Sequence, residues 1–196
     1  MREKGKGIRD NFKLLLHCCC APCSVQCVEY LRSENIKPHL FWYNFNIHPF
    51  LEFKSRLECF KEFAFEEDLK YTAFEDYELK GFLNKVFINS EKHCVNCYRV
   101  RLEKTARFAS QEGYSAFTTT LLISPYQDHE AIKSIGEEMS NKYNVEFYYK
   151  DFRPLFREGQ AAARSKGMYM QKYCGCIFSE EERYIKDFSQ RKYNVN

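Results

Sequence analysis

Short apolar segments alternate with longer helical ones along most of this chain, and this alternation limits the fold more than any other feature. Five segments have the short length and the apolar, aromatic or β-branched composition of strands: 13–17, 38–44, 69–76, 115–122 and 145–152. Strands that alternate with helices form a parallel sheet with helices on both faces. We therefore predict one α/β domain over residues 1–196, with a helical and basic segment at its C-terminal end.

Helix signals separate the predicted strands. Pro22 follows the first strand and opens a helix, and a second helical stretch follows Pro49. Apolar residues recur at helical spacing over 94–111, and Gly113 stops that helix. The dipeptide Ser124–Pro125 is expected to open the next helix.

Half of the cysteines lie directly after the first predicted strand. The stretch LLLHCCCAPCSVQC, residues 14–27, holds five of the ten cysteines. Polar loops also follow the second and fourth strands, as NFNIHP and SPYQDH. Because ligands bind at the carboxyl ends of parallel strands, we expect these three loops to meet and to place cysteines there. Cys27 and Cys59 are expected to be buried packing residues instead.

Two further cysteine groups follow later in the chain. Cys94 and Cys97 are spaced so that both sulfurs can bind one metal centre, and a helix N-terminus favours thiolate. Together with the first group they supply a four-thiolate site, which suits zinc or an iron–sulfur cluster. The spacing favours iron–sulfur, because zinc sites usually have two CxxC-type pairs. Cys174 and Cys176 flank one glycine, so they form either a strained, easily reduced disulfide or two unrelated thiols or extra ligands.

Composition and charge exclude several classes of protein. No segment approaches the roughly 18 apolar residues of a membrane span. The N-terminal stretch MREKGKGIRDNFK is charged and the following LLL is too short for a signal peptide, so we expect a cytoplasmic protein. A reducing compartment disfavours structural disulfides. The chain has no GxGxxG and no P-loop, which argues against NAD or ATP as cofactor.

Five sequence blocks together resemble the cobalamin-independent epoxyqueuosine reductases. The blocks are LLLHCCCAPC, YNFNIHPFLEFKSRLE, CVNCYRVRLEKTA, FTTTLLISPYQ and YCGCIFS, in this order, and the resemblance covers roughly residues 12 to 180. It implies a Rossmann-like sheet similar to that of adenine-nucleotide hydrolases and a [4Fe-4S] cluster. It also implies the reductive deoxygenation of epoxyqueuosine to queuosine at the tRNA wobble position, the last step of queuosine synthesis.

The resemblance also assigns roles to the cysteines. It implies four cluster ligands and a redox-active disulfide pair: Cys19, Cys20, Cys94 and Cys97 as ligands, and Cys174 with Cys176 as the pair. Family members are expected to allow an additional mononuclear iron, for which Cys23 is the candidate ligand. The family usually has an apolar residue where this chain has Cys18, so a register with Cys18 and Cys19 as the ligands stays open.

The same resemblance implies a tRNA partner, bound through its anticodon stem-loop, and an external electron donor. Basic side chains near the C-terminal end are the candidate phosphate contacts: Arg153, Arg157, Arg164, Lys166 and Lys172. Some of the many Phe and Tyr side chains are expected to stack on unpaired bases.

Two other functions remain open from the residues alone. One is a zinc-stabilised RNA-binding module without catalytic activity. The other is a cluster-free thiol oxidoreductase that uses Cys174 and Cys176 and needs neither metal nor RNA. Iron and sulfide content distinguishes all three alternatives.

Overall fold

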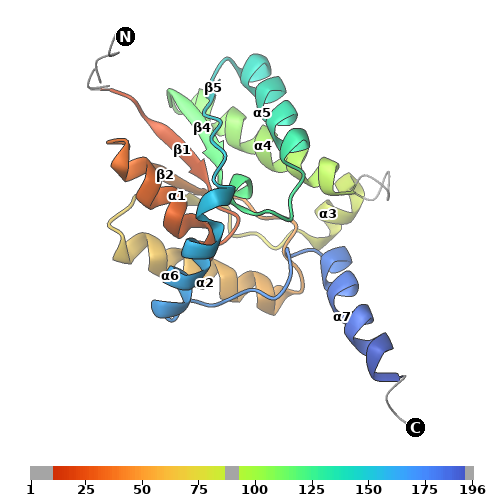
Figure 1. The fold of residues 1–196 in the computed structure, drawn as a ribbon. Helices are drawn as coiled ribbons and strands as arrows, with labels where there is room; N and C mark the ends of the chain where they lie inside the picture. The colour runs from red at the N-terminus through yellow and green to blue at the C-terminus, as the bar shows by residue number, and fades with distance from the viewer. Residues whose placement is uncertain (1–10, 87–92, 193–196) are drawn as a thin grey trace, which may run out of the picture.

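The computed structural model describes residues 11–86 and 93–192 (Figure 1). Within these residues five parallel strands form one sheet, in the order β3-β2-β1-β4-β5. Their bounds are β1 Leu14–His17, β2 His39–Trp42, β3 Tyr71–Ala73, β4 Ala116–Thr119 and β5 Glu146–Phe147. The predicted parallel sheet is therefore confirmed.

The first strand lies at the centre of the sheet. In β1, Leu15 is in register with His39 of β2 on one side and with Phe117 of β4 on the other. All four β1 residues are buried, as are all four residues of β4. A strand that is covered on both faces is expected to be continuously apolar, which explains the Leu-Leu-Leu run.

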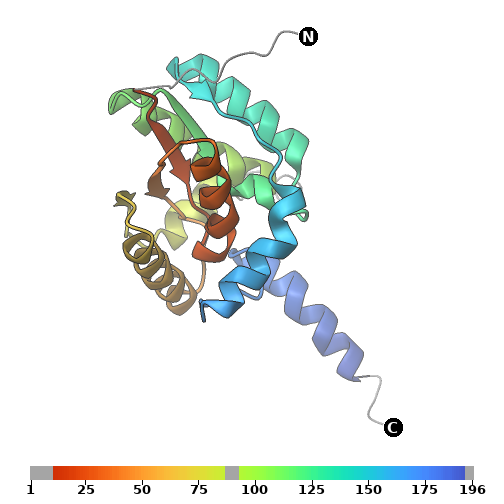
Figure 2. The ribbon, with the colours of Figure 1, turned by 60° about the vertical axis from the view of Figure 1, so that its left-hand side comes forward.

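Helices cover both faces of the sheet (Figures 1 and 2). One layer contains α1 Ala21–Ser33, α2 Phe50–Glu66 and α6 Phe156–Ser165, and α1 packs on both of the others. The other layer contains α3 Leu79–Val86, α4 His93–Gln111 and α5 His129–Tyr143, with α4 packed between the other two. The last helix, α7 Ile177–Lys192, extends away from both layers.

The structure corrects several predicted boundaries. The predicted strand 115–122 ends at Thr119, and Thr120–Ile123 form a 3-10 helix, η2. The turn begins there because the Thr119 side chain accepts a hydrogen bond from Leu121 N and so caps η2. The predicted strand 145–152 keeps only the two residues of β5, and its end leads to the short 3-10 helix η3, Arg153–Leu155.

Two helix predictions also differ from the structure. Helix α5 begins after Asp128, whose side chain accepts a hydrogen bond from Ala131 N, and not at Ser124–Pro125. A carboxylate at the N-cap accepts from a backbone N–H of the first helical turn, which has no partner within the helix. Helix α3 was not predicted, because its eight residues are too few for a clear periodic pattern.

A close approach between α5 and β5 requires a glycine. A Cβ on Gly136 would lie 2.3 Å from the Phe147 ring, so any side chain would push α5 away from the sheet. In the described part of the chain, no helix is long and apolar enough to cross a membrane.

Candidate metal centre

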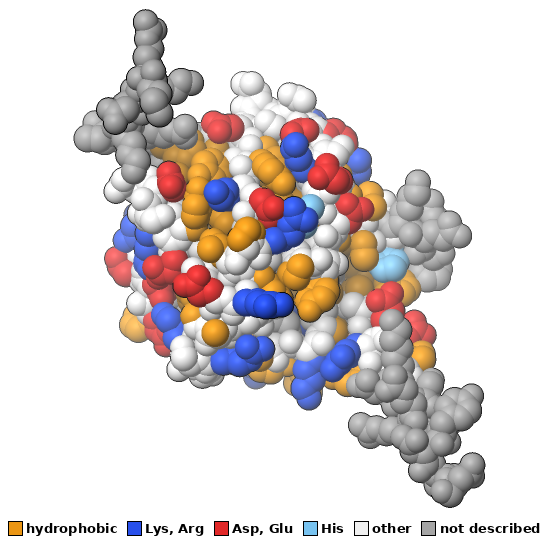
Figure 3. Space-filling view, viewed as in Figure 1, with side chains coloured by type: hydrophobic (Ala, Val, Ile, Leu, Met, Phe, Trp, Pro, Cys, Tyr) orange, Lys and Arg blue, Asp and Glu red, His pale blue; other side chains and the backbone are white. Residues whose placement is uncertain are grey.

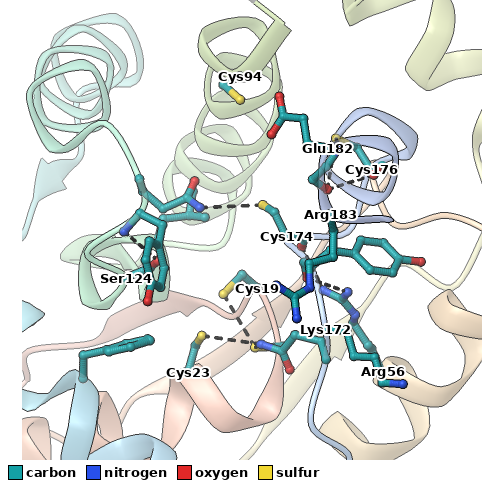
Figure 4. A pocket seen from close by; sticks show the side chains of 18 of the residues that line it. Cys19, Cys23, Arg56, Cys94, Ser124, Lys172, Cys174, Cys176, Glu182 and Arg183 are labelled. Carbon is teal, nitrogen blue, oxygen red and sulfur yellow. Dashed lines mark hydrogen bonds between the residues drawn. The ribbon is translucent and has the colours of Figure 1, made fainter. Parts of the chain in front are cut away.

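The polar loops meet as predicted at the carboxyl ends of β1, β2 and β4. The loops after β1 and β4 line a cavity of about 1230 Å³, together with α4, α6, Arg56 of α2 and the segment that leads into α7 (Figure 4). The loop after β2 lies beside this cavity, where Asn44 bonds to Cys18 O and to Arg101. Cysteines from all three sequence groups reach this cavity: Cys19, Cys20, Cys23, Cys94, Cys174 and Cys176. The sheet topology therefore brings together thiols that are far apart in the sequence.

Three thiols form a compact group at the end of β1. The sulfurs of Cys19, Cys20 and Cys23 all lie within 4.8 Å of one another. Those of Cys19 and Cys20 are 3.9 Å apart. A single tetrahedral ion with metal–sulfur bonds of about 2.3 Å spaces its ligand sulfurs roughly 3.8 Å apart, so this geometry fits thiols that share a metal centre.

The local fold fixes the three thiols. Cys20 is the N-cap of α1, and Cys23 lies in the first turn of that helix. Thr120 of η2 accepts a hydrogen bond from Cys19 N at 2.9 Å and donates one to Cys19 Sγ at 3.2 Å. On the open side, Gln171 Nε2 lies 2.8 Å from Cys20 Sγ and 3.9 Å from Cys23 Sγ. Both the β4–η2 junction and the C-terminal segment therefore contribute to the group.

The three thiols share their protons unequally. Hydrogen bonds from Cys20 and Cys23, followed by the charge of Arg101, lower the pKa of Cys19 well below its usual value. Burial raises the pKa of Cys20, and the hydrogen bonds with Cys19 and Cys20 raise that of Cys23. The group therefore loses its first proton most readily at Cys19.

The other cysteines of the first block are packing residues in the structure. Cys18 is fully buried, its sulfur donates to Leu16 O, and burial raises its pKa to about 12. Its side chain does not belong to the three-thiol group. Cys27 is fully buried within α1, and Cys59 is buried in α2.

Cys94 and Cys97 lie in the first turns of α4, as predicted. Cys94 is exposed and lines the cavity opposite the three-thiol group (Figure 4). Cys97 is half-buried, and burial raises its pKa to about 12, although the neighbouring Arg101 charge acts in the opposite direction. Both sulfurs lie outside the 4.8 Å group, and of the two only Cys94 lines the cavity.

Helix α2 holds the loop that carries Cys174 and Cys176. The buried Arg56 donates to Cys174 O at 2.8 Å and to Tyr173 O at 3.0 Å, and it pairs with Glu52. His48 N donates to Gly175 O at 2.7 Å. Sequence analysis did not identify Arg56 as a site residue, because nothing in its i, i+4 spacing from Glu52 distinguishes it from an exposed helical ion pair.

Gly175 permits the bend between Cys174 and Cys176 that was expected. Its φ is +140°, and a Cβ would lie 3.2 Å from both Arg56 and Ile47. The two thiols have different surroundings in this structure, and neither is in a disulfide. Cys174 is exposed, with Gln127 Nε2 at 3.7 Å from its sulfur, whereas Cys176 is buried against Ser179.

The five candidate phosphate contacts are all exposed but fall into two groups. Arg153 is paired with Asp151, and Lys166 is paired with Glu67. The other three line the cavity and have no salt bridge to a described carboxylate: Arg157, Arg164 and Lys172. In Figure 3, Lys and Arg side chains gather between α6 and α7.

Arg183 and Tyr126 line the same cavity, and the sequence analysis did not identify either of them. The part of the cavity lined by these two residues and by Arg157, Arg164 and Lys172 is called the mouth below. Tyr126 is 83% exposed and makes an edge-to-face contact with Phe156. The SPYQDH motif could have pointed to Tyr126, because its loop was already expected at this edge.

Arg101 is the other site residue that sequence analysis missed. It follows Cys97 by one helical turn, so the two side chains share a face of α4. The structure buries Arg101 and places this residue beside the cavity.

The donor set fits a metal centre. Soft thiolates select zinc, copper(I) and iron–sulfur clusters over harder metal ions. The three neighbouring thiols therefore fit a bound soft metal centre.

Comparison with known proteins gives consistent results. The family model of epoxyqueuosine reductase QueH matches residues 14–182. A QueH protein of Dehalococcoides mccartyi is 34% identical over 174 residues, covering 89% of this chain and 96% of that protein. A QueH protein of Thermotoga maritima is 35% identical over 189 residues, covering 88% and 93%.

The fold also has a counterpart among solved structures. The U34-tRNA thiolase NcsA from Methanococcus maripaludis, solved with its [4Fe-4S] cluster, matches with a TM-score of 0.58 at 16% identity, covering 95% of this chain and 70% of that one. This likeness confirms the predicted Rossmann-like fold, a parallel sheet flanked by helices. The family model and the two relatives confirm the resemblance seen in the sequence: the chain belongs to the epoxyqueuosine reductase QueH family.

Proposed function

We propose that this protein reduces epoxyqueuosine to queuosine in tRNA. Family membership across residues 14–182 supports the reaction, and the observation that carries the proposal is the group of three thiols within 4.8 Å of one another, which lies inside the matched region. A zinc-stabilised module would not need the second, separate thiol pair at the α7 end of the cavity. A cluster-free thiol oxidoreductase would not need the compact group.

The proposed cofactor is a [4Fe-4S] cluster held by Cys19, Cys20, Cys94 and Cys97. The first two come from the three-thiol group and the second two from the first turns of α4. Cys23 would remain free to hold a mononuclear iron. When bound, the cluster would supply one-electron transfer, and a mononuclear iron at Cys23 would supply Lewis acidity toward the epoxide oxygen.

The reaction needs more electrons than one cluster passes at a time. Converting an epoxide to an alkene and water consumes two electrons and two protons. Oxidation of Cys174 and Cys176 to a disulfide releases two electrons and two protons, and an external electron donor then restores the dithiol. Both cysteines line the cavity, Cys174 exposed and Cys176 buried, and the positive φ of Gly175 gives the bend between them.

The tRNA is proposed to approach the mouth between α6 and α7. Arg157, Arg164 and Lys172 supply positive charge there, and phosphate contacts of this kind release counterions. The exposed Tyr126 ring, supported by Phe156, offers a face on which an unpaired base stacks, worth roughly 1–3 kcal/mol per base. We propose that this mouth binds the anticodon stem-loop.

One preparation tests the cofactor and the reaction together. Anaerobically reconstituted protein is expected to contain iron and sulfide. It should also convert epoxyqueuosine-containing tRNA to queuosine-containing tRNA, which mass spectrometry of the nucleosides measures. A colourless protein containing zinc would favour the RNA-binding module. Dithiol oxidation without metal and without tRNA would favour the thiol oxidoreductase.

A matched pair of variants tests the tRNA surface. Arg157→Glu with Arg164→Glu is expected to weaken binding of an anticodon stem-loop and to reduce its salt dependence, with the cluster spectrum unchanged. Arg153→Glu is the control, because Arg153 is already neutralised by Asp151. Equal weakening by both changes would place the RNA on another surface.

A further inference from the structure

Arg101 has an unusual position for a charged side chain. It projects from α4 into the interior, where only 2% of the residue is exposed, and it is among the largest fully buried side chains of the protein. A guanidinium stays protonated in proteins, so its positive charge is permanent. Burying an ion costs several kcal/mol even after relaxation, unless opposite charge compensates it.

No carboxylate among the described residues pairs with this charge. The Arg101 guanidinium donates to the neutral Asn44 Oδ1 at 2.6 Å, and its Nε has no hydrogen-bond partner in the described structure. Arg56, the other buried arginine beside the cavity, shows the usual solution, because it is paired with Glu52. The Arg101 charge is therefore uncompensated by the protein's acidic side chains as far as the structure describes them.

The groups that do surround Arg101 are cysteines. Arg101 lines the cavity together with Cys19 and Cys174, and Cys97 precedes it by one turn of α4, so one cysteine of each sequence group lies near it. Its backbone lies one turn after Cys97, and its partner Asn44 donates to Cys18 O, so the residue is fixed between α4 and the β1 loop. A buried cation at the centre of a thiol site is stable when the thiols, together with whatever they bind, carry net negative charge.

We propose that Arg101 is the counter-cation of an anionic thiolate-bound metal centre and raises the reduction potential of that centre. This rests on the proposed function. An iron–sulfur cluster bound by four thiolates is an anion, and it gains one more negative charge when it accepts an electron. A fixed positive charge in a buried site stabilises the reduced form more than the oxidised form, because Coulomb interactions are stronger at low dielectric. Arg101 is then a positioning residue that tunes electron transfer without touching the substrate.

The test is a redox titration of reconstituted protein, with dithionite as reductant and the visible or EPR signal of the cluster as readout. Arg101→Gln is expected to shift the midpoint potential to a more negative value, and Arg101→Lys to restore most of it. Arg99→Gln is the matched control, because it removes the same charge from the same helix where Arg99 is exposed and paired with Glu138. Equal potentials in Arg101→Gln and Arg99→Gln would overturn the proposal.

A second variant protects the test against failed assembly. If Arg101→Gln does not take up the cluster, Asn44→Asp keeps the arginine and places a carboxylate against it, so it should also lower the potential. An unchanged potential in Asn44→Asp would overturn the proposal. The wild-type titration distinguishes failure of the proposed function from failure of the role proposed for Arg101. Wild-type protein that binds no cluster refutes the proposed function. A bound cluster whose potential is unchanged by both substitutions refutes only the role of Arg101.

Discussion

Two cysteine regions of the same cavity are built in opposite ways. The three thiols of Cys19, Cys20 and Cys23 are held at the end of the central strand by side chains that contact the sulfurs themselves. The loop of Cys174 and Cys176 is instead held through its backbone, by Arg56 and by His48 N, and its two sulfurs have separate surroundings. The first region fixes the positions of its sulfurs through direct contacts. The second region fixes its backbone, and its two sulfurs contact different side chains.

The largest effect is expected from removing the thiols that are proposed to hold the cluster. We expect Cys19→Ala, Cys20→Ala, Cys94→Ala and Cys97→Ala each to lose most of the iron and sulfide and all measurable reduction, because each is a proposed cluster ligand. Iron, sulfide and turnover are measured on the same preparations. Cys18→Ala and Cys59→Ala are controls, since both are packing residues in the structure. A cluster that survives Cys20→Ala but not Cys18→Ala would move the ligand register by one residue.

Removing the other pair should separate metal content from turnover. Cys174→Ser and Cys176→Ser are expected to keep bound iron and the folded state but to lose at least about 90% of turnover, a loss of about tenfold or 1.4 kcal/mol in the barrier. The reason is that the pair is proposed to store electrons and not to bind the cluster. Loss of iron in either variant would make that cysteine a ligand, and full turnover in both would remove the redox role.

Detaching the second loop from α2 should give an intermediate effect. Arg56→Gln leaves Glu52 without its partner and removes the donors to Cys174 O and Tyr173 O. Breaking a buried ion pair in this way costs roughly 3–5 kcal/mol, measured as loss of unfolding free energy in urea. We expect iron content to stay near wild type while turnover falls. Arg56→Lys keeps the positive charge but loses the forked donor geometry of the guanidinium, so its turnover should lie between those of the wild type and Arg56→Gln. Iron loss equal to that of Cys19→Ala would show that α2 supports both regions.

The smallest effect is expected from mild acid, which should lower the free energy of unfolding through protonation of His48, next to the second loop. Burial lowers the pKa of His48 to about 4, so the folded protein binds its proton less readily than the unfolded chain does. Stability from this group is present above its unfolded pKa near 6.5 and is lost as the pH falls from there toward 4, by at most about 1.4 kcal/mol per pH unit. Urea unfolding of metal-free protein at pH 7, 6 and 5 measures the slope. His48→Gln should flatten it, and an unchanged slope would assign the effect to other groups.

The fold was predictable because its signals are local and repeat along the chain. The Leu-Leu-Leu run, Pro22 and the helical spacing up to Gly113 each describe a segment by its own residues. The errors lie where side chains decide the geometry: Thr119 turns the chain into η2, and Asp128 caps α5. Both interactions depend on the orientation of one side chain, which a hydrophobic pattern does not contain.

The site was only half predictable, for a related reason. Cysteines are rare enough that their spacing indicates a site, and all three groups meet at the same cavity. The residues that act on them were not predictable, because Arg56, Arg101 and Thr120 are common residue types in ordinary positions. Their roles come from tertiary contacts with partners as distant in sequence as Thr120 and Cys19, 101 residues apart.

The central position of β1 has a consequence for how the protein is made. Cys19 and Cys20 leave the ribosome early, but the strand that flanks them on one side and the threonine that holds Cys19 come 101 residues later. At roughly 5–20 residues per second, these thiols wait about 5–20 s for that partner during translation. The three-thiol group therefore reaches its final geometry only after η2 has been synthesised.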